Sequence, residues 1–306
     1  DAVDGAEPQA ALPSALGRWA DVVLPAPDRT GYETAVRAAL AEIHEGNSYE
    51  VCLTAETHEP LAGPLSLPTA LGLYLAQRRA NPAPHAAFLW GGDFAVLCSS
   101  PERFLRVAAD GWCEAKPIKG TAARSADSQV DADCARALAA DPKTRAENLM
   151  IADLMRNDLS RVCRPGSIRV PVLFGVETYA SVHQLVSTVR GRLRPGRTAA
   201  DLLAACFPPG SMTGAPKPRT LEIIDRLEGR ARGIYSGTLG WIGADGTADL
   251  AVVIRTLVLS RGEAPGTTTA SIGAGGAIVA DSDPAAEYEE MLAKLRAPLP
   301  PGWRIG

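Results

Sequence analysis

The sequence predicts an α+β fold with antiparallel sheets. Segments with strand-like alternation and segments with helical spacing occur in clusters along the chain, not in strict βαβ order. Hydrophobic residues make up 46% of the 306 residues and charged residues 22%, which is typical of globular domains. A chain of this length can bury a sizeable core. These observations exclude a collagen, a coiled coil and a disordered chain.

The first 30 residues are expected to be a linker or a truncated edge. Residues 1–27 are acidic and rich in Ala and Pro. They lack the basic region and apolar core of a signal peptide. The catalytic domain is expected over residues 31–306.

In the first half of the chain, apolar residues at helical spacing alternate with short strand-like runs. Gly46 and Asn47 end the first helix, and Asn81 with Pro82 ends the second. The predicted order is a helix over Tyr32–Glu45, a strand over Tyr49–Thr54, a helix over Leu65–Arg79, strands within Ala86–Val107, and helices over Cys134–Ala140 and Thr144–Val162.

In the second half, turns rich in Gly and Pro separate the elements. Residues 207–219 hold too many of both for a regular element, a Gly-rich turn is expected at Gly273–Gly276, and Pro284 opens the last helix. The predicted order is strands over Ser167–Leu173 and Ser187–Leu193, helices over Thr198–Cys206 and Thr220–Leu227, strands over Thr238–Ile242, Leu250–Leu259, Thr268–Ile272 and Ile278–Ala280, and a helix over Pro284–Arg296.

Charge and cysteine usage narrow the class of protein. The net charge is −4 and basic residues are scattered, which argues against nucleic-acid binding. There is no transmembrane run, so no membrane partner is expected. The six cysteines form no CxxC motif. This spacing favours buried reduced thiols in a cytoplasmic protein over a disulfide framework or a zinc site.

The last helix carries the most informative pattern of charges. Glu287, Glu290 and Lys294 lie on one stripe beside the apolar stripe. On spacing alone, a solvated acidic face with a Glu290–Lys294 pair is the favoured interpretation. The alternative is half of a Mg²⁺ site, because Mg²⁺ takes oxygen ligands. Glu147, near the start of the Thr144–Val162 helix, could supply the other half.

Three further side chains are candidates for catalysis, each with a structural alternative. Lys119 precedes Gly120 in a half-apolar strand, where burial could lower its pKa, although most such lysines are exposed strand ends. Glu102 is either a general acid/base or a partner of Arg103. His183, on an alternating strand, is more typical of a satisfied core residue than of a catalyst.

Anion binding is a further possibility. The turns Gly210–Gly214 and Gly273–Ala277 could offer backbone N–H groups, although neither is a P-loop. Arg255 is a charged residue within an apolar strand-like run. Buried arginines are paired, so Arg255 needs either a bound carboxylate or a structural acid.

Taken together, long motifs along the chain resemble the chorismate-utilising enzymes. The resemblance runs from about Tyr32 to Leu295 and rests on SSPERF (99–104), KPIKGT (116–121), RAENLMIADLMRND (145–158), SVHQLVS (181–187), PGSMTGAPK (209–217), IYSGTLG (234–240), IRT (254–256) and GGAIVADSDPAAEYEEMLAK (275–294). It implies a large mixed sandwich of mainly antiparallel sheets flanked by helices. It also implies that the family's N-terminal portion is largely absent from this chain.

Two positions discriminate within the family. The PIKGT form with Lys119 is similar to the branch that aminates chorismate at C4, whereas anthranilate synthases carry a small residue there. Isochorismate and salicylate synthases have a water-activating Lys at the place of Glu50, so its absence disfavours the addition of water at C2. The SYEVCLT segment (48–54) is similar to that of fused glutaminase–synthase forms.

The resemblance implies Mg²⁺-dependent conversion of chorismate to 4-amino-4-deoxychorismate for p-aminobenzoate and folate formation. Ammonia is expected from a glutamine amidotransferase, either a separate subunit or a fused glutaminase domain. By resemblance, Lys119 is the nucleophile at C2, Glu102 the general acid/base and His183 a secondary catalytic candidate. The implied metal ligands are Glu147 and Glu290, with Glu287 as a further or more distant ligand.

The resemblance also implies a set of substrate-binding residues. Gly120, Thr121, Ser211 and Thr213 are expected to line the substrate. The turn Gly275, Gly276 and Ala277, together with Arg255, Tyr235 and Lys294, is expected to hold the carboxylates. Ala277 departs from the family's third glycine, which reduces the freedom of φ at that position.

Two alternatives remain open. The chain could be an anthranilate synthase or a 2-amino-2-deoxyisochorismate synthase, which the regiochemistry of the product would distinguish. It could also be a non-catalytic homologue that binds an amidotransferase. The retained charged set argues against that reading, because a scaffold has no need of it; the set is Glu102, Lys119, Glu147, Arg255 and Glu290.

Overall fold

The computed structural model describes residues 17–179 and 182–306 and confirms the α+β fold. The helices are η1 (Gly17–Trp19), α2 (Arg29–His44), α3 (Leu67–Ala80), α4 (Ser128–Ala140), α5 (Pro142–Ser160), α6 (Ala199–Cys206), η2 (Gly210–Met212), α7 (Lys217–Glu228) and α8 (Pro284–Arg296). The strands are β1 (Val22–Leu24), β2 (Glu50–Ala62), β3 (His85–Trp90), β4 (Phe94–Ser100), β5 (Arg103–Val107), β6 (Trp112–Ala115), β7 (Ile118–Ala123), β8 (Arg169–Thr178), β9 (Val182–Arg192), β10 (Gly214–Ala215), β11 (Thr238–Ile242), β12 (Ala248–Val252), β13 (Thr256–Arg261), β14 (Thr267–Ile278) and β15 (Trp303–Ile305).

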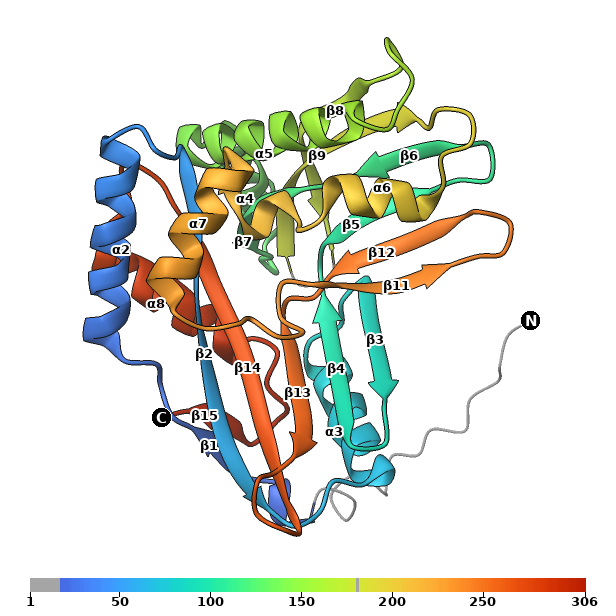
Figure 1. Cartoon of the computed structure of the whole chain (residues 1–306). Coiled ribbons are helices and arrows are strands. Elements are labelled where there is room, and N and C mark those ends of the chain that lie inside the picture. The colour runs from blue at the N-terminus through green and yellow to red at the C-terminus, as the bar shows by residue number, and fades with distance from the viewer. Residues whose placement is uncertain (1–16, 180–181) are drawn as a thin grey trace.

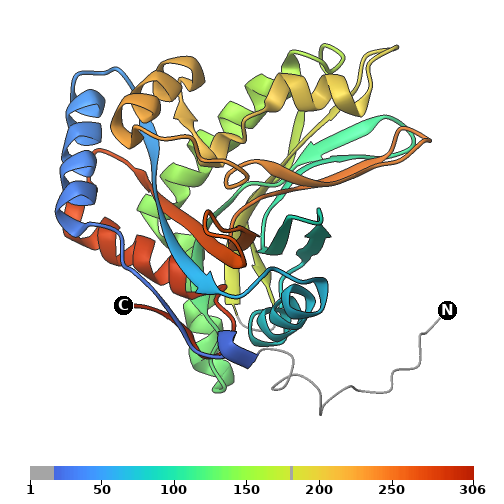
Figure 2. The same cartoon turned by 60° about the horizontal axis from the view of Figure 1, so that its bottom comes forward.

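Two large antiparallel sheets organise these elements. The six-stranded sheet has the order β10-β2-β14-β13-β4-β3, and the seven-stranded sheet has the order β11-β12-β5-β6-β9-β7, with β8 paired to β9. Helices α2 and α8 pack beside the long strands β2 and β14, whereas α5 packs on β9 and against α6 (Figure 1). Figure 2 shows the same grouping from a second direction, with α3 beside β4.

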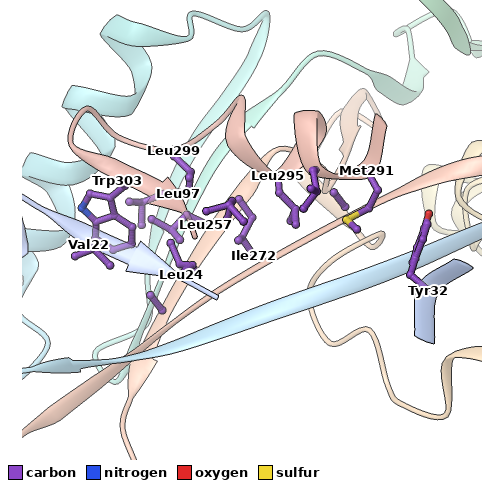
Figure 3. Packing of buried hydrophobic residues seen from close by; sticks show 14 of the residues in the cluster. Val22, Leu24, Tyr32, Leu97, Leu257, Ile272, Met291, Leu295, Leu299 and Trp303 are labelled. Atoms are coloured by element: carbon purple, nitrogen blue, oxygen red, sulfur yellow. The ribbon is translucent and has the colours of Figure 1, made fainter. Parts of the chain in front are cut away.

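Each sheet has its own hydrophobic core. The first lies between the six-stranded sheet and helices α2, α3 and α8, where Leu257, Ile272 and Leu295 are almost completely buried (Figure 3). The second lies between the seven-stranded sheet and helices α5 and α6, around Ile151 and Leu202. The two cores are separate, so core side chains do not fill the space where the sheets meet, and a site can form there.

The described part of the expected linker, residues 17–30, is instead folded. Val22 and Leu24 in β1 pair in parallel with β15 and are buried with Trp303 in the first core (Figure 3). Trp19 belongs to the same core. Asp28 then caps α2 by accepting hydrogen bonds from two backbone N–H groups. Residues 17–30 are therefore packed as part of the folded chain, while residues 1–16 lie outside the described residues.

The C-terminal half contains several differences between prediction and structure. Residues 207–219 hold η2, β10 and the start of α7. The expected strand Leu250–Leu259 is two strands, β12 and β13, divided around Arg255. The expected turn Gly273–Gly276 lies inside β14, which pairs with β2 from Thr267 to Ile278. In the described residues, no helix is long and apolar enough to cross a membrane.

Candidate active site

A cavity of about 620 Å³ lies where the two large sheets meet α5 and α8. This volume is within the range of small-molecule sites. Most of the residues expected from the sequence line it: Glu102, Lys119, Gly120, Thr121, Glu147, Ser211, Tyr235, Arg255, Gly275, Gly276, Ala277, Glu287, Glu290 and Lys294. Segments far apart in the sequence thus converge on one space.

The chain crosses from one sheet to the other at two neighbouring points. Between β4 and β5 it passes through Glu102, and between β12 and β13 it passes through Arg255. The Ser99 N–H donates to the Arg255 carbonyl (3.1 Å), and the Val252 N–H donates to the Glu102 carbonyl (3.0 Å). Arg255 has a φ of +52°, a conformation that costs energy for a non-glycine residue. The crossings place one acid and one cation in the cavity.

A bulge in β7 places Lys119 in the cavity. The register of β7 against β9 shifts between Ile118 and Thr121, and Gly120 has a φ of +83°. A Cβ at Gly120 would lie 2.3 Å from the Thr144 methyl carbon on α5, so only glycine fits. Bulges commonly re-aim a side chain next to a functional site.

The Lys119 amine is nearly buried and forms an ion pair with Glu50. Its Nζ lies 2.7 Å from Glu50 Oε1, and the two side chains are 10% and 0% exposed. Burial alone would lower the pKa of Lys119, but the charges of Glu50 and Glu147 outweigh it and the pKa lies above its ordinary value. The expectation of a lowered lysine pKa is therefore wrong, because the sequence does not show the acids that surround the amine.

Glu102 is a buried acid poised to be protonated near neutral pH. Burial raises the pKa of Glu102 to about 7, against the opposing effects of the Ser211 hydroxyl, the Lys119 charge and the backbone of Ile118. A carboxyl with such a pKa can donate a proton to a leaving group at neutral pH. Its predicted alternative role, as the partner of Arg103, is filled instead by Asp249 (Nε–Oδ1 2.9 Å).

Three carboxylates from two helices gather on another wall of the cavity. The carboxylates belong to Glu147, Glu287 and Glu290. Lys143 on α5 lies between the first two, because its Nζ is 3.9 Å from Oε1 of both Glu147 and Glu287. Glu287 on α8 also accepts a hydrogen bond from the Ser282 hydroxyl (2.6 Å). Burial raises the pKa of Glu147 and of Glu287, and the charge of Glu290 adds to both shifts. The two acidic helices therefore meet.

The expected Glu290–Lys294 pair is present and reaches the long strand. Lys294 Nζ lies 2.6 Å from Glu290 Oε1 and donates to the Gly275 carbonyl (2.8 Å). Gly275 belongs to a strand and not to an anion-binding turn, which corrects the prediction for 275–277. The N–H and C=O of one strand residue point to the same edge, so the Gly275 N–H also faces the cavity side.

Gly276 allows the acidic helix to approach β14 closely. A Cβ at this position would lie 2.8 Å from Glu287 Oε2. The run of small residues at 275–277 therefore makes room for a carboxylate as well as for a ligand. The φ of Gly276 is not in the left-handed region, so glycine is required at this position because of the limited space.

The acid cluster suits a magnesium ion in its chemistry. Among residues 17–179 and 182–306, no three His, Cys, Asp or Glu side chains are gathered closely enough to hold an ion by themselves. Mg²⁺ needs fewer protein ligands than that, because it usually binds one or two carboxylates together with substrate oxygens and water. Glu147 and Glu290, which repel each other electrostatically, meet that requirement.

Arg255 has a guanidinium group suited to an anionic ligand. Within the described parts of the chain its guanidinium group forms no hydrogen bond or ion pair, and burial lowers its pKa. The ring of Tyr235, which is buried, lies on the same cavity wall. Since buried cations need a counter-charge, a ligand carboxylate is the natural partner.

Two predicted residues lie away from the cavity. His183 uses both ring nitrogens in contacts between α4 and the sheet, with Thr178 Oγ1 (2.9 Å) and Asp131 Oδ1 (3.0 Å). Thr213 directs its hydroxyl to the carbonyls of Pro209 and Gly210 within its own loop. Neither residue lines the cavity in the structure, and His183 is buried as the core residue that its strand pattern favours.

Three residues of the site escaped sequence reasoning. Gln184 lines the cavity where His183 does not, because neighbouring residues of a strand face opposite sides. Lys143 is recognisable only once α5 and α8 meet. Glu50 was noted only as the place of a missing lysine, and no local pattern connects it to Lys119, 69 residues away.

Comparison with known proteins assigns the chain to a family. A family model described as chorismate binding enzyme matches residues 2–300. An aminodeoxychorismate synthase from Streptomyces pristinaespiralis is 52% identical over 268 residues, which are 88% of this chain and 36% of that protein. An aminodeoxychorismate synthase component 1 from Klebsiella aerogenes is 45% identical, over 87% of this chain and 56% of that protein.

The fold agrees with a solved structure as well. Anthranilate synthase component I from Streptococcus pneumoniae superposes with a TM-score of 0.77 at 33% identity, covering 89% of this chain and 59% of that chain. This chain thus spans only 36% to 56% of the length of the curated relatives described. The family match, the shared fold and the convergent cavity lead to one conclusion: the chain belongs to the chorismate binding enzyme family.

Proposed function

We propose that this chain aminates chorismate at C4 to form 4-amino-4-deoxychorismate, on the route to p-aminobenzoate. The observation that carries the proposal is that one cavity holds both the Lys119 amine and the Glu102 carboxyl. The Lys119 amine is a nucleophile once it is neutral. The Glu102 carboxyl, whose pKa is raised to about 7, still carries a proton in part of the molecules at neutral pH. Relatives named aminodeoxychorismate synthase support the same activity.

The cavity offers groups of opposite charge for a dianionic substrate. Arg255 and Lys294 are the cations for the carboxylates, and the backbone N–H of Gly275 adds a hydrogen-bond donor. Glu147 and Glu290, with Glu287 beside them, would hold Mg²⁺. The ion would neutralise the ring carboxylate and act as a Lewis acid.

The chemistry divides into two displacements. Lys119 Nζ forms a bond to C2 while the two conjugated ring double bonds shift and the C4 hydroxyl leaves as water with a proton from Glu102. Ammonia then forms a bond to C4, both double bonds shift back and the bond between C2 and Lys119 Nζ breaks. Covalent catalysis of this kind directs the amine to C4 and splits one difficult step into two.

The ammonia is proposed to come from a glutamine amidotransferase. The Klebsiella relative is named a component 1, which implies a second component for that protein. The present chain is proposed to use the same arrangement, with a separate or fused glutaminase. Free ammonium should replace the partner in an assay, because ammonia itself is the reacting species.

The first prediction concerns Lys119→Ala. The rate of 4-amino-4-deoxychorismate formation from chorismate, ammonium and Mg²⁺ should fall roughly 1,000-fold or more, since the nucleophile is lost. Lys116→Ala is the matched control, because Lys116 lies three residues earlier and pairs with Glu177 (2.5 Å). Full activity of Lys119→Ala with an unchanged product would refute the nucleophile role.

The structural likeness to an anthranilate synthase component I favours one second candidate, anthranilate formation. The two activities differ in where the nitrogen is attached. Chromatography of the product against both standards separates them. Anthranilate as the main product of the wild-type chain would overturn the proposal of amination at C4, whereas a well-folded chain that turns over no chorismate would favour a non-catalytic homologue.

A further inference from the structure

We propose that Glu50 is the proton acceptor that converts the Lys119 ammonium group into the neutral amine needed for attack. This inference rests on the function proposed above, in which Lys119 is the nucleophile. It assigns a catalytic role to Glu50, the position at which isochorismate and salicylate synthases have a lysine. The role follows from three features of the structure.

The first feature is the isolation of the pair. Glu50 is fully buried at the start of β2, and its Oε1 lies 2.7 Å from Lys119 Nζ. Among the described residues, Glu50 supplies the one hydrogen-bond acceptor of the Lys119 amine. Glu147 acts on the amine through its charge without a hydrogen bond. A proton leaving Lys119 therefore has a single direct acceptor in the free protein.

The second feature is an unused acceptor atom. Glu50 Oε2 is buried and has no hydrogen-bond partner within the described part of the chain. A buried carboxylate that served only as a structural ion pair would be expected to satisfy both oxygens. Within the described residues, no hydrogen bond therefore competes for this oxygen of Glu50.

The third feature is the rigid placement of Glu50. The Glu50 carbonyl accepts a hydrogen bond from the Ser48 hydroxyl (2.9 Å), and Tyr49 N–H donates to the Ala215 carbonyl (2.7 Å). The backbone of Gly214 lies so close that a Cβ there would be 1.9 Å from the Glu50 carbonyl oxygen. The backbone that carries the carboxylate is therefore held in position before any ligand binds.

The transfer balances in atoms and charge. An ammonium group has no lone pair, and the acids around Lys119 keep it protonated in the free protein. One proton moves from Nζ to the Glu50 carboxylate, which leaves a neutral amine beside a neutral carboxylic acid. The lone pair on Nζ then forms the bond to C2. When ammonia displaces the lysine, the departing nitrogen recovers the proton from Glu50.

Glu50→Gln is the decisive variant, because it keeps the size of the side chain and its ability to accept a hydrogen bond but cannot take a proton. In steady state with chorismate, ammonium and Mg²⁺, kcat should fall about 100-fold or more. The Kd for chorismate should stay within about threefold of wild type, because the acids and cations that hold the substrate are untouched. Addition of formate to Glu50→Ala should restore part of kcat by supplying an external carboxylate.

A control and a second variant keep the test decisive. Gln77→Leu removes another buried polar side chain with an unpartnered oxygen, on α3 away from the cavity, and should leave kcat unchanged. If Glu50→Gln fails to fold, Glu50→Asp retains the charge but withdraws the carboxylate from Nζ, and it should lower kcat more than tenfold at unchanged Kd.

The outcomes separate this inference from the proposed function. If Lys119→Ala is inactive while Glu50→Gln keeps a third or more of the wild-type kcat, Glu50 is not the acceptor and the proposed function stands. A loss confined to chorismate affinity or to the melting temperature would assign Glu50 a structural role and overturn the inference. Full activity of Lys119→Ala would overturn both.

Discussion

At the scale of single residues, burial and neighbouring charges perturb the ionisable groups of the cavity. Burial raises the pKa of Glu102 to about 7, Lys119 is buried and charged, and Arg255 is half-buried without a partner in the described chain. Perturbed groups of this kind, converging on one cleft, are characteristic of active sites. Their cost to stability can be measured.

The pKa of Glu102 predicts a dependence of stability on pH. The folded-state pKa of about 7 lies above the unfolded value of 4.5, so the folded protein holds a proton that the unfolded chain releases. The resulting stabilisation is complete below about pH 4.5 and is lost as pH rises through about 7. The difference corresponds to about 3 kcal/mol.

Glu102→Gln removes this titration and provides the measurement. In urea unfolding, the wild-type chain should lose about 3 kcal/mol more than the variant between about pH 4.5 and pH 8. Other carboxyl groups contribute equally to both proteins and cancel in the comparison. Parallel pH profiles for the two proteins would show that Glu102 is not protonated in the folded state.

Local patterns in the sequence were sufficient to predict most of the residues that line the cavity, whereas contacts between distant segments were not. Lys119, Glu102 and Arg255 lie beside breaks in regular structure, which local patterns reveal. The alternating pattern around His183 favours a satisfied core residue, and in the structure both of its ring nitrogens have hydrogen-bond partners. The ion pair between Glu50 and Lys119 joins two strands that are distant in sequence, and no local pattern encodes it.

At the scale of elements, features that depend on local sequence were again predictable, and features that depend on distant segments were not. Helices α2 and α8 were predictable because their capping residues and apolar stripes are local features. The continuity of β14 was not, because its glycines suggest a turn and its pairing with β2 overrides that tendency. Close approach of Glu287 gives Gly276 a packing role that the sequence pattern cannot distinguish from a turn.

A buried ion pair joins three of the helices beside the Ser211 loop. Lys217, at the start of α7, lies 2.6 Å from Asp158 Oδ2 on α5 and donates to the Cys206 carbonyl at the end of α6 (2.8 Å). Burial raises the pKa of Asp158, and the charge of Lys217 opposes the rise. The pair therefore holds the loop that carries Ser211 between α6 and α7.

Lys217→Met should destabilise the fold strongly. It leaves Asp158, whose side chain is 5% exposed, without its counter-charge, which typically costs about 3–5 kcal/mol. Urea unfolding at neutral pH measures the loss. The double variant Lys217→Met with Asp158→Leu should recover much of it, because the unpaired charge is removed as well. Equal stability of Lys217→Met and wild type would show that the pair contributes nothing.

At the scale of the whole molecule, the cavity is where two separately packed cores are joined by polar groups. Gly275 comes from the six-stranded sheet and Lys119 from the seven-stranded sheet, while Glu147 and Glu290 come from helices that cover different sheets. A ligand that contacts these groups together would connect both halves. Binding should therefore stabilise the whole chain against cooperative unfolding and not one element alone.

Arg255 provides the test of this expectation, because it lies between β12 and β13, where the chain passes from the seven-stranded to the six-stranded sheet. Chorismate with Mg²⁺ at about 100 times Kd should raise the Tm of the wild-type chain by about 5 °C or more. Arg255→Met should keep or slightly raise the Tm of the free protein, since an unpaired cation leaves the cavity, and should lose most of the ligand-induced increase. Arg261→Met, an exposed change at the end of β13, is the matched control and should respond like wild type. An undiminished increase in Arg255→Met would show that the crossing does not hold the substrate carboxylate.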